Sequence, residues 1–338
     1  MSSKQILVTG GAGFIGSHIV RHHMEKGDRV WVVDNLLVGR LENLKPYSNK
    51  DSFRFDQADV CKWTGLKEAV EWSDKIYHMA AIVGQRQVLA KSIETLSTNI
   101  HSCEAILEAL SDTGKKNVRL LIASTSGAYC HCVADTDGTF HENAMLSFPS
   151  GEYLQEAYPL SKVLTEVMCL SYLHQKGIDC VMARIFNTIG VNQSSSYGFV
   201  VPTFIEQALK GLPLTVYGTG LQTRSFSDAR DTVAAFDLLL ENPRSKGEIV
   251  NVGDDREYSI IDLAKLVIEK TQSKSEIRYL SYKDAYGVNF KDVERRRPNL
   301  DKLQKLTGFH PKWNLEQTIE AVIAAKSGTG KVSGSAQQ

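Results

Sequence analysis

Short runs of consecutive apolar residues alternate with longer segments of helical periodicity along the first half of the chain. An unbroken apolar run is typical of a parallel strand covered on both faces, and a 3.6-residue period predicts a helix that covers it. The buried strands that we expect are Gln5–Thr9, Arg29–Asp34, Lys75–Ala80, Leu120–Ser124 and Cys180–Ile185. Helical periodicity is clearest over Gly16–Lys26, Ser92–Leu110 and Tyr158–Gln175. The pattern predicts an α/β fold with a Rossmann-type, doubly wound parallel sheet.

The rhythm changes after about residue 187, where apolar runs become shorter and less regular. Ser225–Leu240 and Gly247–Gly253 resume the strand and helix pattern of the first half. We therefore expect a nucleotide-binding domain of residues 1–187 plus 226–253. A smaller C-terminal substrate-binding domain would be formed by 188–225 plus 254–325. The polar, Gly/Ser-rich tail at 326–338 is predicted to be disordered.

Composition excludes several functions for this chain. Its 338 residues carry 39 basic and 39 acidic side chains, which argues against nucleic acid as a partner. No run of about 18 apolar residues predicts a membrane span. The start MSSKQILVTGG lacks a signal-peptide pattern, and the six cysteines show no disulfide spacing, so we expect a cytoplasmic protein with reduced thiols. Cys130-His131-Cys132 has no matching ligand pair elsewhere for a structural zinc, so no metal is expected.

A glycine-rich turn follows the first strand and opens the first helix, with glycines at Gly10, Gly13 and Gly16. In this context the spacing indicates a dinucleotide site, in which a pyrophosphate rests on free N–H groups at a helix N-terminus. Asp34 ends the second strand and would accept hydrogen bonds from both hydroxyls of the adenosine ribose. Because it would repel a 2′-phosphate, NAD is favoured over NADP. Asp59 and Val60 flank the adenine or belong to a plain surface loop.

Tyr158 and Lys162 lie four residues apart on a predicted helix, so they share one face. A nearby ammonium and the positive nicotinamide ring would lower the pKa of the phenol and make it a base. Ser124 and Thr125 stand at the carboxyl end of a strand, where a hydroxyl can bond the substrate hydroxyl that Tyr158 deprotonates. This spacing is common by chance, and it gains weight from the nucleotide site.

Together these stretches resemble the extended short-chain dehydrogenase/reductase family, in its branch of nucleotide-sugar epimerases, dehydratases and decarboxylases. The resemblance runs from about residue 4 to 320 and rests on TGGAGFIGSH, VVDNLLVGRLENL, YHMAAIVG, YPLSK, ARIFNTIG, PLTVYGTGLQTRSF and DVERRRPNL. It implies an enzyme that binds NAD and a nucleoside-diphosphate sugar, with UDP as the expected nucleotide. It also implies a homodimer built through the helices at Ser92–Leu110 and Tyr158–Gln175.

The resemblance also implies the functional residues. The catalytic residues would be Thr125, Tyr158 and Lys162. The cofactor would be met by Gly10, Gly13, Phe14, Ile15, Asp34, Asn35, Asp59, Val60, Ala80, Asn99, Ser124, Tyr158 and Lys162. The substrate would be met by Ser126, Asn187, Tyr217, Arg224 and Arg296. Arg224 can instead form a domain-interface ion pair, and Arg295, Arg296 and Arg297 can instead form a solvated basic run.

The reaction type depends on the fate of the 4-keto sugar formed by oxidation at C4, and Gly127 bears on this choice. Similar dehydratases carry Asp-Glu after the catalytic threonine and similar decarboxylases carry Ser-Glu, whereas this chain has Ser126-Gly127. Because glycine cannot move protons, we expect a UDP-sugar 4-epimerase first, then a UDP-glucuronate decarboxylase, then a 4,6-dehydratase. His141 or Glu142 could replace the missing acid, although an exposed loop is the simpler expectation. The alternative from another class is an NAD-sensing module without turnover.

Overall fold

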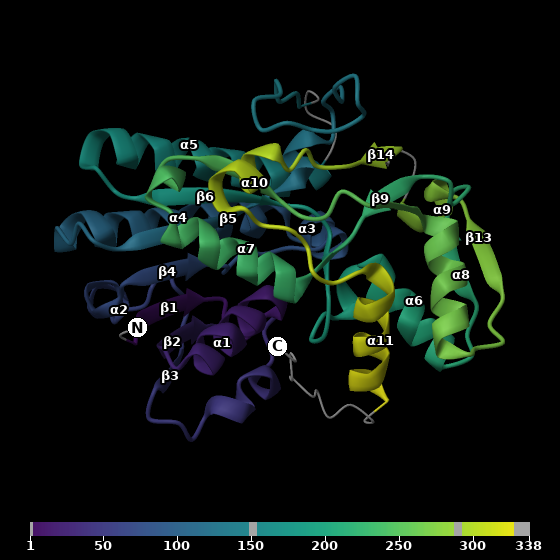
Figure 1. The fold of residues 1–338 in the computed structure, drawn as a ribbon, viewed down its shortest axis with the longest axis horizontal. Helices are drawn as coiled ribbons and strands as arrows, with labels where there is room; N and C mark the ends of the chain where they lie inside the picture. The colour runs from purple at the N-terminus through teal and green to yellow at the C-terminus, as the bar shows by residue number, and fades with distance from the viewer. Residues whose placement is uncertain (1–2, 149–153, 287–292, 328–338) are drawn as a thin grey trace.

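The computed structural model describes residues 3–148, 154–286 and 293–327. Its larger part is a seven-stranded parallel sheet with the strand order β3-β2-β1-β4-β5-β6-β11 (Figure 1). The strands are β1 Gln5–Thr9, β2 Arg29–Asp34, β3 Phe53–Gln57, β4 Lys75–His78, β5 Arg119–Thr125, β6 Cys180–Ile185 and β11 Ile249–Val252. This order confirms the predicted doubly wound α/β class.

Helices cover both faces of the sheet and account for its continuous apolar strands. On one face lie α1 Phe14–Lys26, α7 Ala229–Glu241 and α10 Asp301–Thr307. On the other lie α2 Leu66–Trp72, α4 Ser92–Thr113 and α5 Ala157–Lys176. In β1, Ile6 and Val8 pack into the first core and Leu7 into the second. A strand with both faces buried has no place for polar alternation.

The chain runs outward from β1 to β2 and β3, then returns to β4 on the other side of β1. Thr9, at the end of β1, pairs with Val33 of β2 and with His78 of β4. Strand order therefore reverses between β1 and β4. In open α/β sheets, ligands bind beyond the carboxyl ends of the strands at such a point.

The smaller part lies beyond the carboxyl edge of the sheet, at the right of Figure 1. Its core packs α6 Val200–Leu209, α8 Ile260–Thr271 and α11 Leu315–Lys326 around short strands. These strands pair as β8 with β13, β9 with β12 and β14, and β7 with β10. Their bounds are β7 Thr188–Ile189, β8 Leu214–Tyr217, β9 Thr223–Ser225, β10 Ser227–Asp228, β12 Glu257–Ser259, β13 Ile277–Leu280 and β14 Arg295–Arg296, and two short helices are α3 Gln85–Ala90 and α9 Tyr282–Tyr286.

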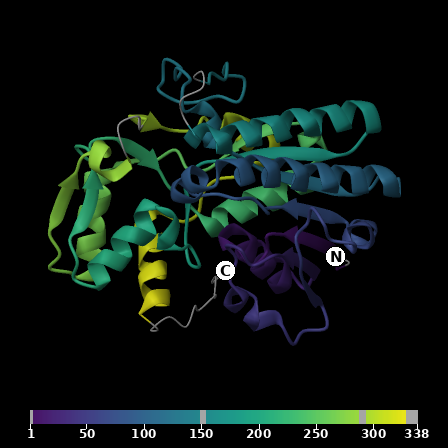
Figure 2. The ribbon, with the colours of Figure 1, turned by 180° about the vertical axis from the view of Figure 1, so that it is seen from behind.

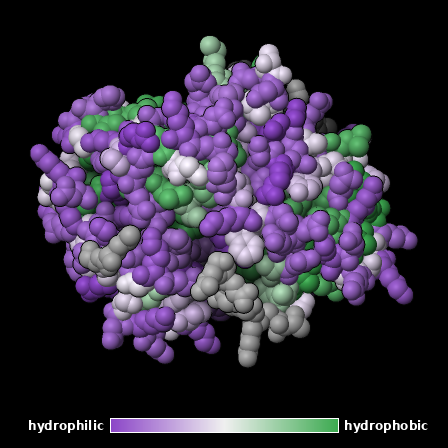
Figure 3. All heavy atoms as spheres, in the orientation of Figure 1, coloured by the Kyte–Doolittle hydropathy of each residue, from purple (hydrophilic) through white to green (hydrophobic). Residues whose placement is uncertain are grey.

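The predicted division into two domains stays a prediction, although β11 joins the large sheet beside β6 and α7 packs on its face. The tail expected to be disordered falls almost wholly outside the described residues. None of the helices described is long and apolar enough to span a bilayer. Most side chains on the face in Figure 3 are hydrophilic, with hydrophobic groups gathered in separate patches.

Candidate active site

A cavity of about 1240 Å³ lies along the carboxyl edge of the sheet and extends to the smaller part. Its walls include residues from the ends of β1, β2, β4, β5 and β6 and from α6, α8, β8 and β14. Every site residue expected from the sequence lines this cavity except Asn99. The lining residues are Gly10, Gly13, Phe14, Ile15, Asp34, Asn35, Asp59, Val60, Ala80, Ser124, Thr125, Ser126, Tyr158, Lys162, Asn187, Tyr217, Arg224 and Arg296.

The turn after β1 brings bare backbone to the cavity wall. Gly10 has a φ of 70°, and a Cβ there would come within 2.7 Å of the Ala80 nitrogen. A Cβ on Gly16 would overlap the Gly10 carbonyl, so helix α1 packs directly on the turn. Gly13, at the N-cap of α1, supplies no capping side chain. The first N–H groups of this helix lack intrahelical acceptors and are suited to an anion, so the cradle fits the pyrophosphate of NAD.

Asp34 ends β2 at the cavity and is only 7% exposed. Its Oδ2 accepts the Ala12 N–H at 3.0 Å and its Oδ1 accepts the Leu36 N–H at 2.8 Å. A Cβ on Gly39 would lie within 2.8 Å of Oδ2, so a larger residue there would press on the carboxylate. Burial raises the pKa of Asp34, while these two hydrogen bonds lower it. Further hydroxyl donors would favour the charged form, which suits a ribose.

Thr125, Tyr158 and Lys162 line the same cavity from β5 and α5. The Thr125 Oγ1 accepts the Gly127 N–H at 3.0 Å. Burial raises the pKa of Tyr158 to about 12, although a hydrogen bond with Thr125 acts in the opposite direction. Burial also lowers the pKa of Lys162 to about 8. The lowered phenol pKa expected from the sequence is therefore absent from the chain by itself, because burial outweighs the hydrogen bond.

Two residues expected to meet the cofactor form hydrogen bonds within the protein through their side chains. The Ser124 hydroxyl donates to Glu166 Oε1 at 2.5 Å. Asn99 is 1% exposed, accepts the Ile82 N–H at 2.8 Å and donates to Ser161 Oγ at 3.0 Å. The polar atoms of both side chains form hydrogen bonds within the protein. Asn99 thus holds the loop after β4 in place and does not reach the cavity.

The residues expected to meet the substrate enter the cavity from the smaller part and from the loop after β6. Asn187 donates an amide hydrogen to a backbone carbonyl of β9 at 2.9 Å. Arg224 lies on β9, is 8% exposed, and donates to the carbonyl of its neighbour at 2.7 Å. Tyr217 ends β8, and Ser126 follows β5. Amide and guanidinium groups thus line the cavity from the smaller part and from the loop after β6, and groups of this kind suit an anion.

The run of three arginines is divided between the surface and the cavity. Arg295 forms an ion pair with Glu257, and Arg297 lies 3.6 Å from a surface carboxylate. Arg296 lines the cavity, and its Nη2 contacts the Cys130 sulfur at 3.2 Å. The Arg296 Nε is buried and has no hydrogen-bond partner within the described ranges. Arg296 therefore keeps donor capacity for an anion in the cavity.

The loop residues considered as a replacement acid do not line the cavity. Glu142 accepts the Asn251 N–H at 2.8 Å and so fastens the loop to β11. His141 pairs with Asp135 at 3.3 Å, near the surface. Neither side chain is placed to move a proton on a bound sugar.

Sequence reasoning missed a different acid and base, Glu156 and His131. Both line the cavity, and His131 Nε2 lies 2.9 Å from Glu156 Oε1. Glu156 stands two residues before Tyr158, at the start of α5. The sequence could have indicated Glu156 through its position two residues before Tyr158, because residues at the same end of a helix lie near one another.

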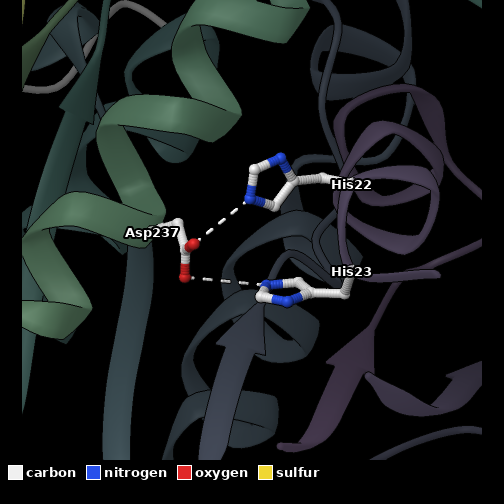
Figure 4. A group of neighbouring side chains, drawn as sticks. All are labelled: His22, His23 and Asp237. Carbon is white, nitrogen blue, oxygen red and sulfur yellow. Dashed lines mark hydrogen bonds and ion pairs between the residues drawn. The ribbon is translucent and has the colours of Figure 1, made fainter. Parts of the chain in front are cut away.

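A second histidine cluster lies outside this cavity. Figure 4 shows His22 and His23 of α1 pointing towards Asp237 of α7, a grouping that could in principle hold a metal. However, the Asp237 carboxylate accepts Lys75 Nζ at 2.5 Å and Lys26 Nζ at 2.6 Å. Burial raises the pKa of Asp237, and hydrogen bonds from His22, Lys26 and Lys75 hold it well below the usual range. Two ammonium groups would repel a cation, so this cluster is an ion-pair network.

Comparison with known proteins gives the class. Residues 6–253 match the model of the NAD dependent epimerase/dehydratase family. The chain belongs to this family, whose description names NAD and thereby confirms the cofactor predicted from the sequence. The expected enzyme family is likewise confirmed.

Two similar relatives are decarboxylases. UDP-N-acetyl-alpha-D-glucosaminuronate decarboxylase of Bacillus cytotoxicus is 33% identical, with 95% of this chain and 97% of the relative covered. UDP-glucuronic acid decarboxylase 1 of Danio rerio is 35% identical, with 95% and 72% covered. Among solved structures, the NAD complex of Thermus thermophilus UDP-glucose 4-epimerase is 28% identical with a TM-score of 0.80, covering 96% of this chain and 99% of that one.

Proposed function

We propose that this chain is an NAD-dependent decarboxylase of a UDP-linked uronate, acting through a 4-keto sugar. The observation that carries the proposal is the position of Arg296 in the same cavity as Tyr158. A uronate adds a carboxylate next to the reacting carbons, and a guanidinium with a buried unpartnered N–H suits such an anion. The near full-length similarity to decarboxylases that act on uronates supports the same choice.

The first step uses the residues that line the cavity beside the cofactor cradle. NAD⁺, when bound, supplies the oxidant for the sugar C4 and a positive charge near the phenol. Tyr158 takes the proton of the C4 hydroxyl, and Thr125 positions that hydroxyl by a hydrogen bond. Lys162 keeps its ammonium one helical turn away and stabilises the phenolate. Asp34 holds the adenosine ribose at the other end of the cavity.

The substrate carries two anionic groups, and two of the arginines that line the cavity, Arg224 and Arg296, lie on strands of the smaller part. Arg224 and Asn187 would bind the diphosphate, since both present N–H donors at the cavity wall. Tyr217 would line the base. Arg296 would then hold the C6 carboxylate.

Decarboxylation follows from the chemistry of the 4-keto uronate. Its carboxylate is attached to C5, beside the C4 carbonyl, so it is a β-keto acid. Loss of CO₂ breaks the C5–C6 bond and moves its electron pair into the C4 carbonyl as an enolate. Thr125 and Tyr158, which position the C4 hydroxyl in the first step, would stabilise that oxyanion by hydrogen bonds.

Epimerisation at C4 is the second candidate, and Gly127 favours it. Returning a hydride to the other face of the keto sugar requires room to rotate and no second proton carrier. The fold shared with 4-epimerases is consistent with either reaction. The 4-epimerase expected first from the sequence thus remains a prediction.

Arg296→Gln tests the proposal, with Arg295→Gln as the matched control. We expect the first variant to lose turnover of UDP-glucuronate and UDP-N-acetylglucosaminuronate by about 10²-fold, the loss of a charge-assisted bond. Arg295, which pairs with Glu257 outside the cavity, should tolerate the change. Equal rates in both variants, measured as CO₂ release, would contradict the role of Arg296.

A further inference from the structure

A histidine and a glutamate form a close pair in the cavity wall and take no part in the proposed oxidation at C4 or in the loss of CO₂. His131 Nε2 lies 2.9 Å from Glu156 Oε1, and both residues line the cavity that holds Tyr158. Glu156 is 5% exposed, whereas the His131 side chain is 25% exposed. The imidazole is thus the more accessible member, and the carboxylate is the buried one.

The surroundings of Glu156 suit a carboxylate that orients the neighbouring histidine ring. It occupies the N-cap position of the 20-residue helix α5, where the helix dipole stabilises negative charge. Its Oε1 faces His131, and its Oε2 is buried without a hydrogen-bond partner in the part of the chain that the structure describes. A buried carboxylate oxygen that no described group satisfies is unusual unless a ligand or a proton completes it.

The pair also lies close in sequence to the turn that carries Gly127 and to Tyr158. The 3₁₀ turn Ser126–Tyr129 begins at the end of β5 and carries Gly127 at its second position. His131 follows that turn by two residues, and Glu156 precedes Tyr158 by two. The fold thus places an acid and a base beside the turn whose second residue has no side chain to move protons.

We infer that the His131–Glu156 pair returns the proton to C5 of the sugar after CO₂ has left. This inference rests on the proposed function, and it deepens that proposal by naming the second proton carrier. His131 is the proton donor in this step, and Glu156 orients its ring through the 2.9 Å contact. His131 is therefore the catalytic residue, and Glu156 is the positioning residue.

Atoms and electrons balance in this protonation step. Loss of CO₂ leaves the electron pair of the former C5–C6 bond delocalised over C5 and the C4 oxygen. The imidazolium of His131 gives its proton to C5, a new C5–H bond forms, and the C4 carbonyl is restored. His131 becomes neutral and regains a proton from water. The hydride removed from C4 in the first step then returns to the restored C4 carbonyl, so the conversion of uronate to pentose and CO₂ consumes no net oxidant or reductant.

The chain contains a matched pair for comparison. His141 lies 3.3 Å from Asp135. The side chain of Asp135 is 57% exposed, and neither residue lines the cavity. The two pairs share their chemistry and differ in burial and position. His141→Asn is therefore the control for His131→Asn.

The test is a single turnover of the NAD-loaded enzyme with UDP-glucuronate in D₂O. Wild type should release CO₂ and place deuterium at one of the two C5 positions of the pentose. In His131→Asn and Glu156→Gln, reduced nicotinamide should appear at the wild-type rate, because C4 oxidation does not need the pair. Pentose formation should fall by about 10²-fold or more, the usual contribution of a general acid. The residual product should be a mixture in which some molecules carry the single deuterium at one C5 position and the others at the second.

The outcomes separate the two proposals. His131→Asn and Glu156→Gln that give singly labelled pentose at the wild-type rate would overturn the role of the pair and leave the proposed function standing. A wild type that retains C6 of both uronates would overturn the proposed function and, with it, this inference. Because His131 is partly exposed, its variant should fold even if Glu156→Gln does not.

Discussion

The Ser124 hydroxyl at the end of β5 donates a hydrogen bond to Glu166 Oε1 over 2.5 Å. Glu166 in turn accepts two parallel bonds from Arg184, at 2.9 and 2.8 Å. All three side chains are at most 3% exposed. A serine that the sequence placed with the cofactor therefore serves a buried ion pair.

Ser124→Ala should lower the free energy of unfolding without changing NAD affinity. Removing the hydroxyl takes a donor from a buried carboxylate, at a cost of about 1–3 kcal/mol. Urea denaturation and cofactor titration would measure the two quantities. Ser171→Ala, an exposed serine on α5, is the control. A large rise in the dissociation constant of NAD for Ser124→Ala alone would show that the hydroxyl does bind the cofactor.

Asp34→Asn should weaken NAD binding and reduce the preference over NADP. The neutral amide loses charge-assisted hydrogen bonds to the ribose hydroxyls, worth about 1.5–3 kcal/mol, and no longer repels a 2′-phosphate. Isothermal titration with NAD and NADP would give both affinities. Asp51→Asn, outside the cavity, should bind both as wild type does. An unchanged ratio of the two dissociation constants in Asp34→Asn would contradict this role.

Tyr158→Phe should abolish turnover and leave NAD bound. Removing a positioned base costs about 10²–10⁴-fold in rate, and the ring that remains fills the same space. The measurements are kcat and the amount of cofactor retained after gel filtration. Tyr47→Phe, remote from the cavity, should behave as wild type. Activity near the wild-type level would remove Tyr158 from the mechanism.

The free energy of unfolding should fall in weak acid because His78 is buried. This side chain is 1% exposed, and burial, followed by the charge of Lys162, lowers its pKa from 6.5 to about 3. Between these values the unfolded chain binds a proton at His78 that the folded chain does not. The contribution of neutral His78 to the free energy of unfolding is therefore complete above pH 6.5 and is lost as the pH falls towards 3. The slope is at most about 1.4 kcal/mol per pH unit.

His78→Asn cannot titrate and isolates this effect. Urea denaturation at about pH 7 and about pH 5 should show a smaller loss of stability for the variant than for wild type. Equal losses for the two proteins would mean that His78 remains neutral in the unfolded chain or is charged in the folded one.

The homodimer stays a prediction, and the surface of α4 and α5 gives it a test. These long helices lie side by side (Figure 2). Leu164 and Val167 on α5 and Ile93 on α4 are 49%, 56% and 79% exposed. A second copy packed there would bury them in a four-helix bundle. Leu164→Asp should convert a dimer to a monomer in sedimentation experiments, and a monomeric wild type at micromolar concentration would contradict the expectation.

Much of the fold could be predicted because buried parallel strands leave continuous apolar runs in the sequence. Gln5–Thr9, Arg29–Asp34 and Cys180–Ile185 were predicted with the bounds that the structure shows. The three predicted helices and the strands predicted at Lys75–Ala80 and Leu120–Ser124 differ from the observed bounds by one to three residues at one or both ends, since ends depend on capping rather than on periodicity. The short strands of the smaller part, two to four residues long, carry too few positions for any periodicity to emerge.

The site residues likewise include some that local sequence motifs predict and others that only the fold brings together. Motifs that are local in sequence, such as the glycine turn and Tyr158 with Lys162, led to predicted site residues that line one cavity, with the exception of Asn99. Side-chain partners cannot be read from the sequence, so the internal hydrogen bonds of Asn99 and Ser124 could not be predicted, and their contact with the cofactor stays a prediction. The His131–Glu156 pair was missed because the two residues stand 25 positions apart and meet only in the fold.

The most direct test of the central claim is an NMR time course of purified protein with NAD⁺ and UDP-glucuronate carrying carbon-13 at C6. The account predicts that the label leaves as CO₂ and bicarbonate while the signals of a UDP-pentose grow. UDP-N-acetylglucosaminuronate in a parallel tube would name the preferred sugar. Retention of the C6 label in a new UDP-uronate with inverted C4 would contradict the account and establish the epimerase instead.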